Sequence, residues 1–189
     1  PQRIGSDYCH GSDGVQGSAP DHSDVIPALS DADLETLKLE LVFVVDTTGS
    51  MTPLLNGTKE VVGRVANLLN GGEFEGSKGM VRIGLVEYKD SDSGRKTSRL
   101  VQPLTEKIAE FQDKLAPLTV SGGGDLPEDV LAGIMTGIKD SGWSRNSSKH
   151  IILVGDARAQ LSGPKNTTGQ TIESMVKLGR KTLGASDAV

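Results

Sequence analysis

The chain has 189 residues, which suits one domain of ordinary size with a flanking segment. Apolar residues make up 35% of it and aromatic residues only 3%, so the core must be built from aliphatic side chains. A formal net charge of −5 argues against a nucleic-acid-binding module, which is usually basic. No apolar run approaches the ~20 residues of a membrane helix. The single cysteine, Cys9, excludes an intrachain disulfide, and the compartment stays open.

Residues 1–37 are rich in Gly, Ser, Asp and Pro and have no sustained apolar period, which predicts a flexible flank or linker before a domain at 38–189. Within that flank, 31–37 could make a short helical turn. The nearly continuous apolar run 39–45 then predicts a central strand buried on both faces. A helix should follow, with Thr52 as its cap and Pro53 at its first position. It should stop at the Asn-Gly-Gly triplet that begins at residue 70.

The second half of the chain predicts further strands and helices in alternation. Residues 80–88 alternate like a strand, and 97–104 can form a short strand that ends near Pro103. Thr105 is a candidate cap for the next helix, whose inner face would carry Ile108, Phe111 and Leu115. After a glycine-rich loop, the sequence predicts a helix opened by Pro127, a fully buried strand at 150–154, and a last helix around 172–183.

This order predicts an α/β fold: a doubly wound, mostly parallel sheet with helices on both faces. The third strand follows the second without a helix between them, so it should be an antiparallel edge strand. In open sheets of this kind, ligands bind outside the carboxyl ends of the central strands. The side chains that follow those strands are therefore the first candidates for a functional site.

Three aspartates fall where that rule points. Asp46 follows the first strand, Asp156 follows the strand at 150–154, and Asp125 lies in the glycine-rich loop. Thr48 and Ser50 stand two and four residues after Asp46, so the three side chains can point the same way in an extended segment. Carboxylate and hydroxyl oxygens are hard ligands that suit Mg²⁺, Mn²⁺ or Ca²⁺ better than Zn²⁺. An alternative interpretation is that the aspartates cap helices and Ser50 satisfies a turn.

Four segments together resemble the von Willebrand factor type A (VWA) domain. DTTGSM (46–51) is similar to the family's metal-ion-dependent adhesion site, and SGGGDLPED (121–129) is similar to the second metal loop of a DxTGSM/GGGDxPE subgroup. IGLVEYKD (83–90) and ILVGDA (152–157) resemble the family's second strand and third metal loop. The resemblance covers about 38–183 and implies a Rossmann-like fold. It assigns the metal-ligand roles of the first and third loops to Asp46, Thr48, Ser50 and Asp156.

The second loop departs from the family's pattern. Many members have a threonine ligand there, whereas Asp125 falls at that position in this chain, with Thr119 and Ser121 as weaker alternatives. Glu128 and Asp129 are interpreted as negative charges in the first turn of the following helix.

Asp125 would bring a third carboxylate to the dication and leave its local shell formally negative. Metal retention should strengthen and attraction for an acidic partner should weaken, so we expect a metal that is at least partly structural. Replacing Asp125 with threonine should therefore change the affinity for a partner. An unchanged affinity in a binding assay would contradict this hypothesis.

The resemblance implies a non-enzymatic module that binds a protein partner through the metal, with an Asp or Glu of the partner completing the coordination. Four loop residues are candidates for setting specificity: Lys89, Asp90, Arg158 and Gln160. A regulatory or assembly role in a larger intracellular protein, such as an alpha-type kinase, is the alternative. A metal-dependent hydrolase is less expected because no histidine ligand or general base accompanies the site. The family's sheet usually has six strands, whereas this sequence predicts four, so we expect the last one or two strands of that sheet to be missing from it.

Overall fold

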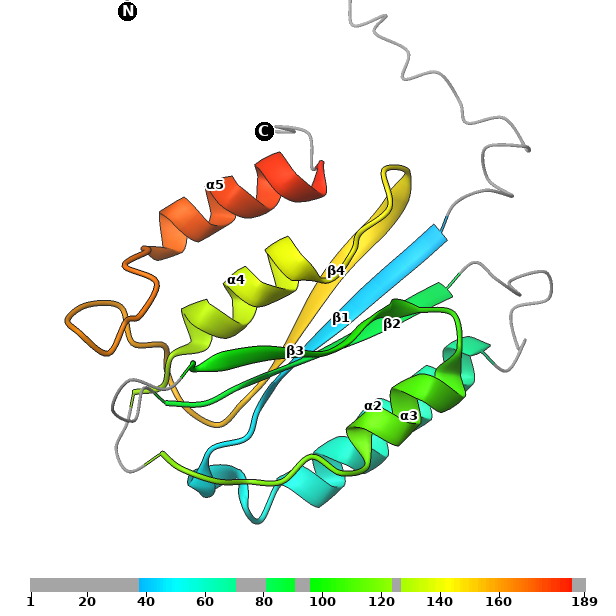
Figure 1. Ribbon diagram of the computed structural model, residues 1–189, viewed down its shortest axis with the longest axis horizontal. Coiled ribbons are helices and arrows are strands. Elements are labelled where there is room, and N and C mark those ends of the chain that lie inside the picture. Colours follow the sequence, from blue (N-terminus) through cyan, green and yellow to red (C-terminus); the bar gives the residue numbers. More distant parts are fainter. Residues whose placement is uncertain (1–37, 71–80, 91–95, 124–126, 185–189) are drawn as a thin grey trace, which may run out of the picture.

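The computed structural model describes residues 38–70, 81–90, 96–123 and 127–184 (Figure 1). The predicted flank at 1–37, its helical turn at 31–37 and the last residues of the chain lie outside these ranges. The elements, in chain order, are β1 (Lys38–Asp46), a 3-10 turn (Gly49–Met51), α2 (Leu55–Asn70), β2 (Val81–Tyr88), β3 (Ser98–Thr105), α3 (Ile108–Leu115), α4 (Val130–Asp140), β4 (Ser147–Val154) and α5 (Ile172–Leu183). None of the helices in the described ranges is both long and apolar enough to cross a membrane.

The four strands form one sheet in the order β3-β2-β1-β4. β1 is parallel to both β2 and β4, and its Phe43 is in register with Leu85 and Ile152. β3 runs antiparallel to β2 at the edge. Figure 1 shows α2 and α3 on one face of the sheet and α4 and α5 on the other. The predicted fold class, including the antiparallel edge strand, is therefore confirmed.

The central position of β1 follows from its side chains. Phe43 and Val45 pack into the aliphatic core beneath α2 and α3, where Phe111 also lies. Val42 and Val44 point to the other face and pack with residues of α4. Because alternate residues of a strand face opposite sides, a strand covered on both faces needs apolar residues at every position. The carboxyl end of β1 is thus held rigidly between two layers of helices.

The prediction of a fully buried strand at 150–154 is wrong. β4 is at the edge of the sheet, paired with β1 alone among the described strands, and Ile152 and Leu153 are 37% and 46% exposed. An apolar run indicates a strand that could be covered on both faces, but it does not indicate how many neighbours that strand has. The run at 39–45 and the run at 150–154 look alike in sequence, and only the pairing in the sheet separates them.

Two predicted helix starts are also displaced. Thr52 does not cap α2: its hydroxyl donates to the Gly49 carbonyl oxygen at 2.6 Å, and the helix begins after Pro53, at Leu55. Pro127 does not open α4, which begins at Val130. In both places the chain first makes contacts within a loop at the carboxyl edge of the sheet, and the helix begins at a later residue.

The third strand and the helix after it lie close to the prediction. β3 continues past Pro103 to Thr105, which an edge strand tolerates because the proline need not donate to a neighbour. The Thr105 hydroxyl accepts a hydrogen bond from the Lys107 backbone N–H at 3.1 Å, just before α3 begins. The three residues predicted for its inner face are buried: Ile108, Phe111 and Leu115.

The closest contact between α4 and the sheet is at Gly133. A Cβ atom there would lie 2.8 Å from Cγ1 of Val44 and 2.9 Å from Cδ1 of Tyr88. We expect Gly133→Ala to lower the free energy of unfolding by about 1–3 kcal/mol, the usual cost of overpacking a core. Gly63→Ala on α2 is the control, since nothing lies within 4 Å of its added Cβ. Urea unfolding of both variants measures the difference, and equal stabilities would contradict the prediction.

Candidate metal centre

Two loops meet at the carboxyl end of β1 and are joined by backbone hydrogen bonds. The Ser121 N–H donates to the Thr47 carbonyl oxygen at 3.0 Å, and the Gly49 N–H donates to the Gly122 carbonyl oxygen at 2.8 Å. Gly123 has a φ of 74°, and a Cβ on it would lie 2.8 Å from Cβ of Thr48. Both the backbone conformation and the close approach therefore require glycine at this position.

The side chains of the first loop reach the loop after β4 through a chain of oxygen atoms. The Thr48 hydroxyl donates to Oδ1 of Asp46 at 2.7 Å, and the Thr48 N–H donates to the same oxygen at 2.8 Å. The Thr48 and Ser50 hydroxyl oxygens are 3.1 Å apart, and the Ser50 hydroxyl donates to Oδ1 of Asp156 at 3.1 Å. The structure thus brings together four of the five predicted metal-site residues. Their role as metal ligands stays a prediction.

The centre is closed on one side and open on the other. Asp46 and Thr48 are fully buried, whereas Ser50 and Asp156 are exposed. Oδ2 of Asp46 has no hydrogen-bond partner among the described residues, although a buried carboxylate oxygen usually has one. The deep side therefore offers a free acceptor, and the outer side faces solvent.

The electrostatics of the centre favour a cation. Burial raises the pKa of Asp46, the hydrogen bonds from Thr48 oppose this rise, and the charge of Asp156 adds to it. Within the described ranges, neither Asp46 nor Asp156 forms an ion pair with a lysine or arginine. Hard oxygen donors, a free buried carboxylate oxygen and uncompensated negative charge fit a divalent ion with oxygen ligands.

Tyr88 closes the floor of the centre. Its ring is fully buried, and a Cβ on Gly155 would lie 2.3 Å from its hydroxyl oxygen, so only glycine fits at the end of β4. Burial raises the pKa of the Tyr88 hydroxyl, and the charge of Asp46 raises it further. Tyr88 therefore stays neutral beside the carboxylate.

Sequence reasoning misplaced two acidic residues before α4. Glu128 and Asp129 were expected as charges in the first turn of the helix, but both precede it and are 2% and 0% exposed. Oδ2 of Asp129 accepts hydrogen bonds from the hydroxyls of Thr97 at 2.8 Å and Thr167. Their contacts come from Thr97, just before β3, and from the loop between β4 and α5, so no local pattern in the sequence indicated that they would be buried.

The Glu128 carboxyl group lies beside the centre. Burial raises its pKa to about 7, and the charges of Asp46 and Asp90 act in the same direction. The Thr48 side chain opposes the rise. One oxygen, Oε2, has no hydrogen-bond partner among the described residues. Glu128 is thus, like Asp46, a buried carboxyl group with one oxygen that has no hydrogen-bond partner among the described residues.

This raised pKa predicts that the metal-free domain loses stability as pH rises. The pKa of Glu128 is higher in the folded state than in the unfolded chain, so its protonated form stabilises the fold. This contribution to the free energy of unfolding is complete below about pH 4.5 and is lost as pH rises through about 7. The loss between these values should reach about 3 kcal/mol, at 1.36 kcal/mol per pKa unit. Urea unfolding after metal removal measures it between pH 4.5 and 8.

Glu128→Gln should flatten this pH dependence, because the amide has no charge to bury. Glu60→Gln, at an exposed position of α2, is the matched control and should keep the wild-type slope. The same slope in both variants would show that Glu128 does not cause the effect.

Two of the three candidates for the second loop, Thr119 and Ser121, lie apart from the oxygen chain. Asp125 is outside the described residues. Ser121 is exposed, and its hydroxyl accepts a hydrogen bond from the Lys89 ammonium at 2.7 Å. Thr119 is also exposed and lines a separate pocket beside Lys114. Neither Thr119 nor Ser121 has a hydrogen bond to the chain from Asp46 to Asp156 in the described structure.

The loop residues expected to set specificity differ in exposure. Asp90 is 4% exposed and lies 3.7 Å from the Lys165 ammonium, so it is not a solvated loop residue. Lys89 is half-buried and contacts Ser121. Arg158 is exposed, and Gln160 is half-buried with its N–H bonded to the Glu128 carbonyl oxygen.

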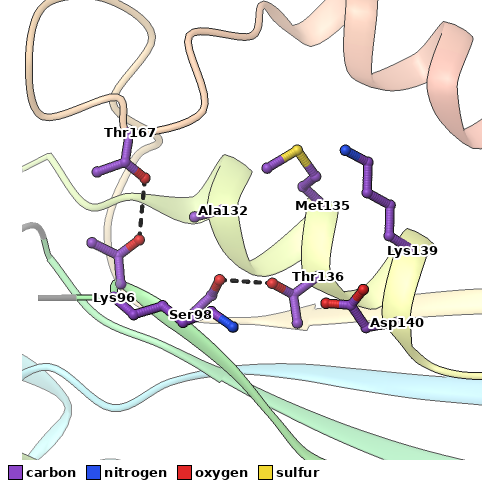
Figure 2. Close-up of a pocket in the computed structure, with 9 residues that line it drawn as sticks. Lys96, Ser98, Ala132, Met135, Thr136, Lys139, Asp140 and Thr167 are labelled. Atoms are coloured by element: carbon purple, nitrogen blue, oxygen red, sulfur yellow. Dashed lines mark hydrogen bonds between the residues drawn. The ribbon is translucent and has the colours of Figure 1, made fainter.

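A pocket of about 300 Å³ lies on the other side of Asp129, between β3, α4 and the loop before α5 (Figure 2). The Ser98 and Thr136 hydroxyl oxygens are 2.7 Å apart in its wall. Figure 2 marks this hydrogen bond with a dashed line. Lys96 and Lys139 stand at its exposed rim. None of the four residues of the oxygen chain lines this pocket, so it is separate from the candidate metal centre.

Two curated relatives match this chain over most of its length. Alpha-protein kinase vwkA from Dictyostelium discoideum is 30% identical over 119 residues, which are 63% of this chain and 18% of the kinase. Hemicentin-2 from Mus musculus is 32% identical over 136 residues, which are 69% of this chain and 2% of hemicentin-2. The chain therefore spans less than a fifth of the length of either relative.

Solved structures agree on the fold. The vWF domain of the type V pili tip protein Mfa5 from Porphyromonas gingivalis has a TM-score of 0.53 and 23% identity, covering 66% of this chain and 39% of that chain. Proximal thread matrix protein 1 from the mussel byssus, with a zinc-occupied metal-ion-dependent adhesion site, has a TM-score of 0.55 and 13% identity. That match covers 77% of this chain and 36% of that chain. The family described as von Willebrand factor A domain matches residues 40–177, so the chain belongs to this family.

Proposed function

We propose that this chain is a non-enzymatic, divalent-metal-dependent protein-binding module. The observation that carries the proposal is the oxygen chain from Asp46 through Thr48 and Ser50 to Asp156, buried at one end and open at the other. A buried end suits retention of an ion, and an open end suits exchange of its outer ligand. A partner with an Asp or Glu side chain would complete the coordination there.

The residues that would hold the ion are Asp46, Thr48, Ser50 and Asp156. The sequence predicts Asp125 as a further ligand. Mg²⁺ is the proposed ion, with Mn²⁺ and Ca²⁺ as alternatives, because the donors are carboxylate and hydroxyl oxygens. The zinc in the thread matrix protein supports a divalent ion at this position of the fold. The bound ion would supply a positive charge that attracts and orients an acidic side chain of the partner.

A second candidate is a regulatory or assembly domain of a larger protein, in which the metal is mainly structural. The match to an alpha-protein kinase and the DxTGSM and GGGDxPE motifs support it. A pili tip protein among the structural neighbours supports the first candidate, the protein-binding module. The two candidates differ in one property, namely whether the ion keeps an exchangeable position for a partner's carboxylate.

The experiment begins with calorimetric titration of the metal-stripped domain with Mg²⁺, Mn²⁺ and Ca²⁺. Water-proton relaxation of the Mn²⁺ complex then counts exchangeable waters on the ion. A short peptide with one central glutamate is added, and the same peptide with glutamine is the matched control. We expect the glutamate peptide alone to displace a water.

Saturable metal binding with displacement by the glutamate peptide supports the protein-binding module. Metal binding without displacement favours the second candidate, with a mainly structural ion. Absence of binding by the folded chain would overturn both.

A further inference from the structure

Glu128 faces the metal centre from the segment that precedes α4. Its side chain is 2% exposed, and Oε2 has no hydrogen-bond partner among the described residues. Oε1 of Glu128 would lie 3.6 Å from a Cβ atom on Gly123, the residue that packs against Thr48. The carboxylate therefore lies beside the buried end of the oxygen chain.

The backbone of Glu128 is fixed in this position by the loop after β4. The Glu128 N–H donates to the Arg158 carbonyl oxygen at 3.1 Å, and the Gln160 N–H donates to the Glu128 carbonyl oxygen at 2.7 Å. These bonds form an isolated parallel bridge between Glu128 and Ala159. Since Asp156 begins the same loop, Glu128 and Asp156 are held to one short segment of chain.

Hydrogen bonds alone do not satisfy the carboxylates around Thr48. Its hydroxyl has one proton and donates it to Asp46 at 2.7 Å, so it cannot also donate to Glu128. Glu128, like Asp46 and Asp156, forms no ion pair with a basic side chain in the described part of the chain. Asp46 and Glu128 are both buried, and each has one carboxyl oxygen without a hydrogen-bond partner among the described residues. A cation between them would satisfy both, whereas unpaired buried charges are strongly unfavourable.

We propose that Glu128 is a ligand of the divalent ion and fills the second-loop role that the sequence assigned to Asp125. The inference rests on the proposed function in one respect, namely that the centre binds a divalent ion. It places two buried carboxylates, Asp46 and Glu128, on the deep side and leaves Asp156 on the exposed side. The ion is then held from within, and its outer face stays open to a partner.

The test compares metal affinities of the whole chain by calorimetric titration with Mg²⁺ and Mn²⁺. Glu128→Gln should weaken binding at least about tenfold. The metal affinity of Asp125→Asn should stay within about threefold of wild type, which is less than the ~10–100-fold loss that removal of a supporting group causes. Glu60→Gln, an exposed glutamate of α2, is the matched control and should bind as wild type. Circular dichroism of the metal-free variants checks that each is folded, which Glu128→Gln should be because it removes a buried charge.

Water-proton relaxation of bound Mn²⁺ separates a ligand from a supporting residue. If Glu128 contacts the ion, Glu128→Ala should admit an additional exchangeable water, whereas a residue that only positions Thr48 would leave the water count unchanged. Wild-type affinity in Glu128→Gln, or an unchanged water count in Glu128→Ala, would overturn the inference while the metal centre stands. A folded wild-type chain that binds neither ion would overturn the proposed function, and this inference with it.

Discussion

Asp46→Asn should abolish metal binding and at the same time stabilise the metal-free domain. Asp46 is fully buried, its Oδ2 has no partner among the described residues, and burial raises its pKa. The amide can still accept the hydrogen bonds from Thr48 but has no charge to offer an ion. We expect the affinity for Mg²⁺ to fall by more than the ~10–100-fold typical of residues that only support a ligand.

Thermal unfolding with and without Mg²⁺ measures both effects. The wild-type midpoint should rise with added metal, because an ion that binds only the folded state stabilises it by mass action. Asp46→Asn should start higher without metal and show no rise. Asp113→Asn, an exposed position of α3, is the matched control and should behave as wild type. A metal-dependent rise in Asp46→Asn equal to that of wild type would contradict the prediction.

The largest loss of stability should come from the opposite end of the sheet, at Glu40. This side chain is fully buried and accepts hydrogen bonds from Arg82 at 2.5 Å, from Ser147 at 2.7 Å, and from both the N–H and the hydroxyl of Ser144. Burial alone would raise the pKa of Glu40, but the hydrogen bonds from Ser144, Ser147 and Arg82 outweigh it and lower the pKa. The network joins β1, β2 and the segment that leads into β4.

Glu40→Ala should therefore lower the free energy of unfolding by about 3–5 kcal/mol, because it leaves the partly buried Arg82 charge without its partner. Glu106→Ala is the control, since it removes an ion pair with Lys38 in which both side chains are nearly half exposed. Such surface pairs contribute about 0–1 kcal/mol. Urea unfolding of the two variants gives the comparison. A loss below about 1 kcal/mol in Glu40→Ala would mean that the network is not a structural support.

The sequence was sufficient for the sheet because strands covered on both faces leave a continuous apolar signature. The run at 39–45 predicted β1, and the absence of a helix after the second strand predicted the antiparallel edge. It was not sufficient for the position of β4, whose run at 150–154 carries the same signature at an edge. The number of neighbours of a strand depends on other segments of chain, so a local pattern cannot determine it.

The same difference between local patterns and contacts of distant segments applies to the residues of the candidate centre. Asp46, Thr48 and Ser50 are neighbours in sequence, and their spacing alone predicted that they would converge. Asp156 was predicted from its place after a strand, because parallel strands end at one edge. Glu128 was missed because it is brought in by backbone pairing with Ala159, a contact between distant segments. The sequence pattern suggested instead a negative charge in the first turn of the helix.

The unequal burial of the oxygen chain has a consequence for the order of events at the proposed centre. Among the described residues, Asp46 and Thr48 are buried, and the side with Ser50 and Asp156 reaches solvent. An ion held at the proposed centre would enter and leave through this exposed side, which is also where a partner's carboxylate would bind. In the proposed mechanism, the complex would therefore assemble with the ion first and the partner second. A bound partner would close the exit, so the ion would exchange more slowly in the complex than in the free domain.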